Sequence, residues 1–321
     1  MVSSRPTSST SRGTKKTRRG GADCDTARIG FVGAGKLATA IITGLISQRG
    51  QVDPKRIYVS APTTINTDSL KITYPGIHTS KRNIDIFGRF DCDIVFICCP
   101  PNVIRSLYKI GGSRPAALTT NFIPNMRHPV YIISLVFGFT VQQIKECLLN
   151  PENPGRYTAQ FFRCVISHPI AYGVGHWWID TEPDSERFPN LVREIFTRIA
   201  LIEYVPESLL DTVCIIVGSG ITFCYYFINA IADGAVKKGM PRKMAVKFAA
   251  KIASSTSQTI LTTDINANQL KEDASSPSGG AIYGQMILDK SEVSSGICGA
   301  IEASYKRSQT LALTGKTENI E

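Results

Sequence analysis

A glycine-rich stretch near the N-terminus has the residue types and the spacing that bind a diphosphate. The sequence GAGKLA directly follows the apolar run IGFV and matches the pattern GxGxxA. The first glycine permits a tight turn, the second lets the backbone approach a pyrophosphate, and the final alanine keeps helix and strand close. The helix N-terminus then faces the phosphates with free N–H groups. The pattern predicts a dinucleotide site at Gly33, Ala34, Gly35, Lys36, Leu37 and Ala38.

The residues at the end of the second predicted strand indicate whether a site binds NADP or NAD. An acid there would bond the ribose 2′-hydroxyl and repel a 2′-phosphate. Asp53 lies before that strand, where a turn or cap residue is expected, whereas the strand ends in Ser60 and Ala61, followed by Pro-Thr-Thr with no acid. Ser60 and Ala61 therefore join the candidate cofactor residues, and the sequence favours NADP, with NAD as the alternative.

A second polar stretch, Ser275–Gly280, forms a serine- and glycine-rich turn that opens a helix. Free N–H groups at such a helix start suit a carboxylate. The same pattern also caps a helix without any ligand. The residues alone leave both interpretations open.

Apolar runs and helical stretches alternate through the first two thirds of the chain. Runs of strand length occur at 29–32, 56–60, 93–99, 130–136 and 202–205, with helices predicted at 37–46 and 188–199. This alternation predicts an α/β fold, a Rossmann-type doubly wound parallel sheet. After Pro206 only helices are expected, at 209–235, 241–262, 279–288 and 294–311. We therefore predict a dinucleotide-binding domain over 27–206 and an all-helical dimerisation and substrate domain over 207–321.

Residues 212–232 carry no charge and are long enough to span a bilayer. Interspersed small and polar residues and the lack of a second such segment favour a buried helix at the core of a dimer. We expect no membrane partner.

Composition excludes other classes of partner. Six basic residues and no acid lie in the first 22 residues, which leaves a net charge of only +4 for the rest of the chain. We interpret residues 1–26 as a disordered basic tail and expect no nucleic-acid binding. Nine scattered cysteines without a CxxC motif indicate reduced thiols and no metal site. The expected compartment is the cytoplasm, with mitochondria as the alternative.

Four motifs together resemble one family: IGFVGAGKLA, DGAVKKGMPRKMA (233–245), QLKEDASSPSGGAI (269–282) and AIEAS (300–304). Over residues 28–312 the chain is similar to the pyrroline-5-carboxylate reductases. The resemblance implies NAD(P)H-dependent reduction of 1-pyrroline-5-carboxylate, a small cyclic imine carboxylate, to L-proline. It also implies a homodimer with interlocked C-terminal helices, with higher oligomers as a further expectation.

The resemblance assigns further site residues. It implies a substrate site at Ser276, Gly279, Gly280, Ala281 and Asp264. It adds cofactor contacts at Asn83, Cys98, Cys99, Pro100, Val136, Phe137 and Asp273.

Departures from the family pattern motivate an alternative function. Ala281 stands where the family has a substrate-bonding threonine, and Pro100 stands where it often has a lysine. The alternative is a non-catalytic or altered-substrate imine-reductase-like protein that retains the fold and NADP binding. A protein acting on nucleic acid or membranes through its tail is the third hypothesis. His168, before Pro169, is either a proton relay or a loop residue.

Overall fold

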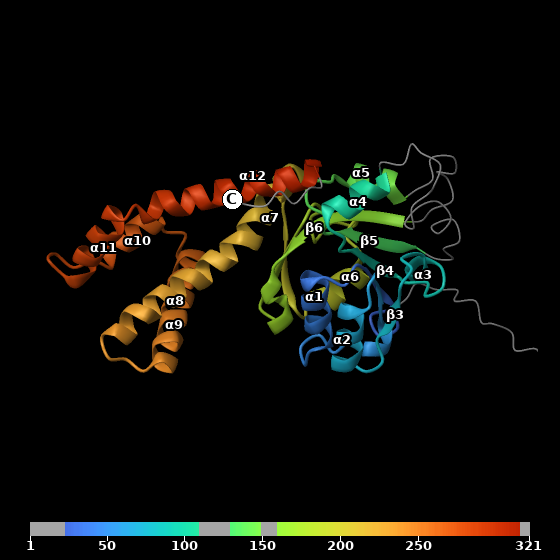
Figure 1. Ribbon diagram of the computed structural model, residues 1–321, viewed down its shortest axis with the longest axis horizontal. Coiled ribbons are helices and arrows are strands. Elements are labelled where there is room, and N and C mark those ends of the chain that lie inside the picture. Colours follow the sequence, from blue (N-terminus) through green and yellow to red (C-terminus); the bar gives the residue numbers. More distant parts are fainter. Residues whose placement is uncertain (1–22, 109–128, 149–158, 315–321) are drawn as a thin grey trace, which may run out of the picture.

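The computed structural model describes residues 23–108, 129–148 and 159–314. A sheet flanked by helices forms one part of the molecule, and long helices extend away from it as a second part (Figure 1). Most of the predicted basic tail, residues 1–26, lies outside the described residues. Its last four residues form a turn in which the backbone N–H of Thr26 donates to Asp23 Oδ1 over 2.8 Å.

Among the described residues the sheet has eight strands, in the order β3-β2-β1-β4-β5-β6-β7-β8. Every neighbouring pair is parallel except β6 and β7, which are antiparallel. The chain order reverses on either side of β1, which creates the switch point where such sheets bind ligands. The strands are β1 (Ile29–Val32), β2 (Ile57–Ser60), β3 (His78–Ser80), β4 (Ile94–Ile97), β5 (Val130–Ser134), β6 (Ala159–Ile166), β7 (Gly175–Ile179) and β8 (Ala200–Tyr204).

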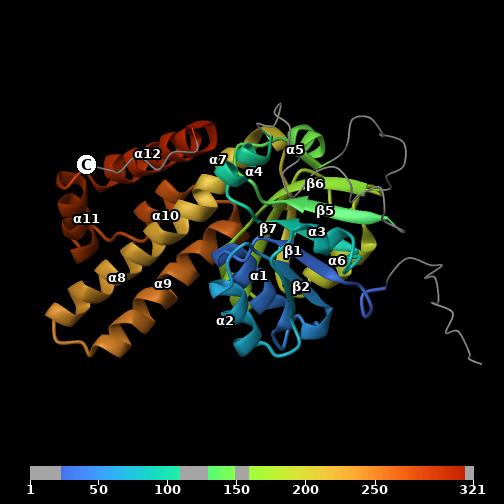
Figure 2. The same ribbon diagram turned by 45° about the vertical axis from the view of Figure 1, so that its right-hand side comes forward.

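Helices cover both faces of this sheet, as a doubly wound fold requires (Figure 2). One face packs against α1, α2 and α6, and the other packs against α3, α4 and α5. Their bounds are α1 (Lys36–Ile46), α2 (Ile65–Thr73), α3 (Ile84–Phe87), α4 (Pro101–Tyr108), α5 (Val141–Leu148) and α6 (Asn190–Phe196), with a 3-10 helix, η4 (His168–Tyr172), after β6.

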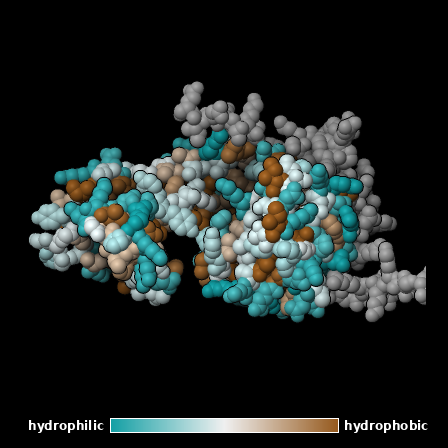
Figure 3. Space-filling model, turned by 60° about the horizontal axis from the view of Figure 1, so that its bottom comes forward, coloured by the Kyte–Doolittle hydropathy of each residue, from teal (hydrophilic) through white to brown (hydrophobic). Residues whose placement is uncertain are grey.

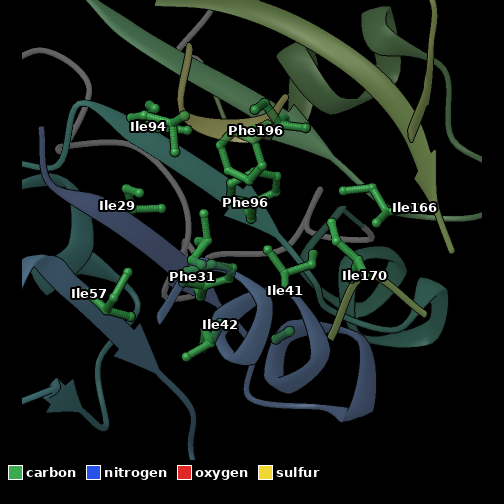
Figure 4. Close-up of a cluster of buried hydrophobic side chains, with 14 of the residues drawn as sticks. Ile29, Phe31, Ile41, Ile42, Ile57, Ile94, Phe96, Ile166, Ile170 and Phe196 are labelled. Atoms are coloured by element: carbon green, nitrogen blue, oxygen red, sulfur yellow. The ribbon is translucent and has the colours of Figure 1, made fainter. Parts of the chain in front are cut away.

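Alternating side chains of the central strands supply the core. Phe31 of β1 and Phe96 of β4 point to the face covered by α1, and their rings stack with centroids 5.2 Å apart (Figure 4). Val32 and Ile97, one residue further along each strand, join the cluster on the opposite face. Each fully buried side chain of this kind contributes about 1.5–3 kcal/mol to the free energy of unfolding. The core therefore holds the carboxyl ends of β1 and β4 in fixed positions.

The fold class predicted from the sequence is confirmed, but the sequence missed three strands. β3 is a short polar edge strand, and β6 interrupts its apolar pattern with Arg163, a side chain that is only 5% exposed. β7 reverses direction, which makes the sheet mixed at β6 and β7.

Over residues 207–314, the second part has helices as its regular elements. They are α7 (Leu210–Ile215), α8 (Ile221–Lys237), α9 (Arg242–Thr263), α10 (Ala267–Asp273), α11 (Gly280–Lys290) and α12 (Val293–Thr314). The predicted helix over 209–235 contains a π-helical segment, η6 (Ile216–Gly220), between α7 and α8, and α10 was not predicted. α12 runs back to contact α4 and α7, which joins the helices to the sheet.

Many apolar side chains of these helices face solvent in the single chain, as the brown patches on the helical part show (Figure 3). Tyr226 of α8 is 78% exposed and Leu261 of α9 is 75% exposed. One helix of the described residues, Glu207–Lys237, has the length and apolar composition to cross a membrane, and 11% of its most apolar window is buried. The expected burial of this helix is therefore not provided by the chain's own fold. Exposed apolar faces of this extent mark an interaction surface.

Candidate functional site

The glycine turn after β1 has the geometry that its sequence predicted. Gly33 has a φ of +107°, a conformation that other residues rarely adopt. A Cβ at Gly33 would lie 2.9 Å from the carbonyl oxygen of Cys98, in the strand-end loop after β4. The first glycine is therefore required by backbone conformation and by close packing of two strand ends.

Gly35 is a glycine for a different reason. It is the N-cap of α1, it has an extended conformation, and a Cβ at this position would meet nothing within 4 Å. No side chain in the described part of the chain caps α1, and the first turn of α1 contains no acid. Free N–H groups thus face open space with no competing negative charge, and this arrangement fits a pyrophosphate.

A groove of about 330 Å³ opens beside this turn. Its lining includes Gly35, Lys36 and Thr39 of the turn and α1, Asn66 of α2, and His168 of η4. Lys36 is exposed and Ala38 is fully buried, so the helix presents its charge to the groove and its small side chain to the sheet.

The end of β2 differs from the expectation in one respect. Ser60 is completely buried, and its hydroxyl donates to Asn83 Oδ1 over 2.9 Å and lies 3.3 Å from the carbonyl oxygen of Phe31. The hydroxyl is therefore engaged inside the protein rather than presented to a ribose. Ser60 instead fixes Asn83, which is half-buried beside the same edge of the sheet.

A second groove, of about 420 Å³, continues from the first, because Lys36 and His168 line both. It lies between the ends of β5 and β6 and the helix formed by α7, η6 and α8. The remaining lining includes Leu135, Cys164, Cys214, Gly218, Thr222 and Tyr225. A planar ring attached to a pyrophosphate at Gly35 could extend into this second groove.

Two thiols that line the second groove, Cys164 and Cys214, and two thiols after β4, Cys98 and Cys99, are neutral packing groups. Burial raises the pKa of Cys98 and of Cys164 well above the usual range, and it raises the pKa of Cys99 and of Cys214 to about 11. A thiol with such a pKa holds its proton near neutral pH and is a poor nucleophile.

The loop after β5 is held by an ion pair that sequence reasoning missed. Arg163 of β6 donates to the carboxylate of Asp211 at the start of α7, and Asp211 also accepts the backbone N–H of Gly138 over 3.0 Å. Phe137 is half-buried in this loop, whereas Val136 is only 2% exposed and points into the core. The sequence feature that could have indicated this ion pair is an arginine within an otherwise apolar strand.

The predicted substrate residues lie elsewhere in the single chain. Ser276, Gly280 and Ala281 are exposed at the start of α11, and α11 lies at the far end of the helical part, apart from α1 of the sheet part, in both ribbon views (Figures 1 and 2). Asp264 ends α9 and Asp273 ends α10, in the same helical part. One chain therefore brings together Gly33–Ala38, Asn83, Cys98–Pro100 and Phe137, but not the helical set.

The start of α11 resembles that of α1 in its capping. Gly279 is the N-cap, and no side chain accepts from the free N–H groups. A Cβ at Gly279 would lie 2.3 Å from Ser276 Oγ, so a larger residue there requires the Ser276 side chain to rotate. The N-cap of α11 is therefore a glycine and not a serine, and both a carboxylate site and a ligand-free helix start remain predictions.

Two family models match consecutive parts of the chain. Residues 28–116 match a model described as NADP oxidoreductase, coenzyme F420-dependent. Residues 207–311 match a model described as pyrroline-5-carboxylate reductase dimerisation.

Curated relatives extend over nearly the whole chain. A pyrroline-5-carboxylate reductase 3 of Xenopus laevis is 28% identical over 287 residues, which cover 88% of this chain and 95% of that protein. A pyrroline-5-carboxylate reductase of Synechocystis is 28% identical over 289 residues, with coverages of 88% and 98%. Among solved structures, the Plasmodium falciparum pyrroline carboxylate reductase with NADP bound has a TM-score of 0.70 and 19% identity, covering 90% of this chain and 99% of that one.

Proposed function

We propose that this chain, a divergent member of the pyrroline-5-carboxylate reductase family, reduces 1-pyrroline-5-carboxylate to L-proline with NADPH. One observation carries the proposal: the open, uncapped glycine turn at Gly35 and the match of residues 207–311 to the family's dimerisation model occur in the same chain. Neither feature alone would specify both the cofactor and the substrate.

The residues of the sheet part hold and orient the cofactor in this proposal. Backbone N–H groups of Gly35 and Lys36 bind the pyrophosphate, and Asn83, positioned by Ser60, contacts the adenosine half. When bound, the reduced nicotinamide supplies a hydride to the imine carbon. Apolar lining in the second groove, such as Leu135 and Val165, excludes water from the reacting atoms.

The substrate requires little covalent chemistry from the protein. A protonated cyclic imine accepts hydride at carbon, its C=N π electrons become the nitrogen lone pair, and proline forms as the secondary amine. The free N–H groups at the start of α11 suit the carboxylate of the substrate. Positioning and charge stabilisation account for the remaining catalysis.

A second copy of the chain completes the site in this proposal, because α11 lies far from the glycine turn of its own chain. The exposed apolar faces of α8, α9 and α11 supply a contact surface for that copy, as does an apolar groove of about 660 Å³ lined by Phe223, Phe227 and Ile297. We therefore propose residues 27–206 as the cofactor-binding unit and 207–321 as the dimerisation and substrate unit, with rings of dimers as a further step.

The same surface argues for a protein partner rather than a membrane. An interlocked dimer would cover the helix Glu207–Lys237 without any lipid. We place the reaction in the cytoplasm, with mitochondria as the alternative, because buried and exposed free thiols suit a reducing compartment. No nucleic-acid partner is proposed.

Loss of NADPH absorbance on adding the imine, with proline measured as product, tests the reaction. NADPH binding without turnover would contradict it and favour a non-catalytic member. A mixed dimer tests the shared site: Gly35→Val disables the cofactor turn, and Gly279→Val disables the start of α11. Each variant alone is expected to be inactive, whereas co-expressed chains should recover about a quarter of the wild-type activity. Heterodimers without recovery would refute a site built from two chains.

A further inference from the structure

Two basic residues lie beside the end of β2. Lys81 and Arg82 directly follow β3, and β3 pairs with β2 in parallel with Ser80 opposite Ser60. Both side chains are exposed, and neither forms an ion pair with any residue that the structure describes. Carboxyl ends of neighbouring parallel strands share one edge, so both cations lie at the edge that carries the glycine turn.

Hydrogen bonds fix this loop to the end of β2. The backbone N–H of Ala61 donates to the carbonyl oxygen of Ser80 over 3.1 Å, and the backbone N–H of Arg82 donates to Ser80 Oγ over 3.0 Å. The bond from Ser60 Oγ to Asn83 Oδ1 closes the loop on its other side. The backbone that carries the two cations is therefore held at the end of β2, next to Asn83.

Local charge favours a phosphate here. Residues 60–67 contain no acid, and the hydroxyl-bearing Thr63 and Thr64 are exposed. Asp85, the acid in the first turn of α3, accepts from Ser80 Oγ over 2.5 Å and is thus engaged within the loop. Asp68 lies one turn into α2. The loop that follows β2, within residues 60–67, therefore has no carboxylate to bind a ribose 2′-hydroxyl.

We propose that Lys81 and Arg82 bind the 2′-phosphate of the dinucleotide and select NADPH over NADH. The inference rests on the proposed function for the presence of a dinucleotide, and it assigns to this loop a recognition role that the glycine turn cannot supply. Arginine forms paired hydrogen bonds with phosphate oxygens, and lysine adds a second charge.

Affinity measurements on the full-length protein test the assignment without any turnover. The probes are NADPH, NADH, 2′,5′-ADP and 5′-ADP, titrated by calorimetry. In the double variant Lys81→Gln/Arg82→Gln, the Kd of NADPH and of 2′,5′-ADP should rise about 10-fold or more, while the Kd of NADH and 5′-ADP should change less than about 2-fold. The variant Lys71→Gln/Arg198→Gln removes the same net charge from exposed positions elsewhere and should leave all four values unchanged.

The outcomes separate this inference from the proposed reaction. A wild-type protein that binds NADPH and NADH equally, or a double variant that weakens all four ligands alike, overturns the assignment of Lys81 and Arg82 but leaves imine reduction intact. Selective weakening of the phosphorylated ligands supports the assignment, even if no proline is formed.

Discussion

Gly33 and Gly35 are two residues apart, and the structure predicts opposite consequences for replacing each with alanine. At Gly33, a φ of +107° costs a non-glycine residue about 1–3 kcal/mol. The new Cβ would also lie 2.9 Å from the backbone oxygen of Cys98, which adds about 1–3 kcal/mol because the backbone cannot rotate away. Gly33→Ala should therefore lower the free energy of unfolding by on the order of 3 kcal/mol.

At Gly35, alanine meets nothing within 4 Å, and the φ of −76° is ordinary. Loss of unfolded-state entropy stabilises such a variant by about 0.4–1 kcal/mol, which roughly offsets the weaker N-cap preference of alanine. Stability should stay within about 0.5 kcal/mol of wild type. The methyl group would, however, occupy the approach of the pyrophosphate and weaken one or two charge-assisted hydrogen bonds, so the Kd of NADPH should rise about 10- to 100-fold.

Urea unfolding and calorimetric titration of both variants check this pair of expectations. If Gly35→Ala binds NADPH as tightly as wild type, the pyrophosphate does not lie over Gly35 and the site is misplaced. If Gly33→Ala is as stable as wild type, the turn relaxes more easily than its contacts with Cys98 imply.

Three further predictions follow from the contacts of the fold. Arg163→Met should lower the free energy of unfolding by about 2–3 kcal/mol, because the carboxylate of Asp211 loses its ion-pair partner. An unchanged free energy of unfolding in urea would contradict the role of this ion pair. Burial raises the pKa of Asp180 above its usual value of 3.8. Between pH 3.8 and the raised pKa, the folded chain keeps a proton that the unfolded chain loses, so the free energy of unfolding falls as the pH rises through this range. Asp180→Asn should therefore be more stable than wild type at pH 7, with a difference that shrinks toward pH 3.8, and a pH-independent difference in melting temperature would count against it. Tyr226→Arg should shift the protein from dimer to monomer in light scattering, whereas Ile72→Arg, an equally exposed site on α2, should not.

The sequence predicted the fold class because its central strands are uniform apolar runs followed by helices. It missed β6 because Arg163 breaks the pattern, and only the tertiary pairing with Asp211 shows why an arginine can be buried there. The three-residue strand β3 has no apolar pattern. The sequence alone therefore does not place the basic loop after β3 beside the end of β2.

Local motifs predict both parts of the candidate site, but not their separation in one chain. Gly33 and Gly35 sit as the GxGxxA pattern requires, and Gly279 starts a helix as expected. That α11 lies far from α1 in the same chain depends on the direction of α8 and α9, which no local pattern encodes. The burial of the Ser60 hydroxyl was not predicted either, because its acceptor Asn83 lies 23 residues further along the chain.

Transfer of deuteride tests the central claim most directly. NADPH carrying deuterium at the transferable position of the nicotinamide is mixed with the protein and 1-pyrroline-5-carboxylate, and the product is analysed by mass spectrometry and NMR. Imine reduction at the Gly35 turn predicts proline with one deuterium on the former imine carbon, and loss of that product in Gly35→Val. NADPH that binds but stays reduced, or is oxidised without labelled proline, would contradict the account.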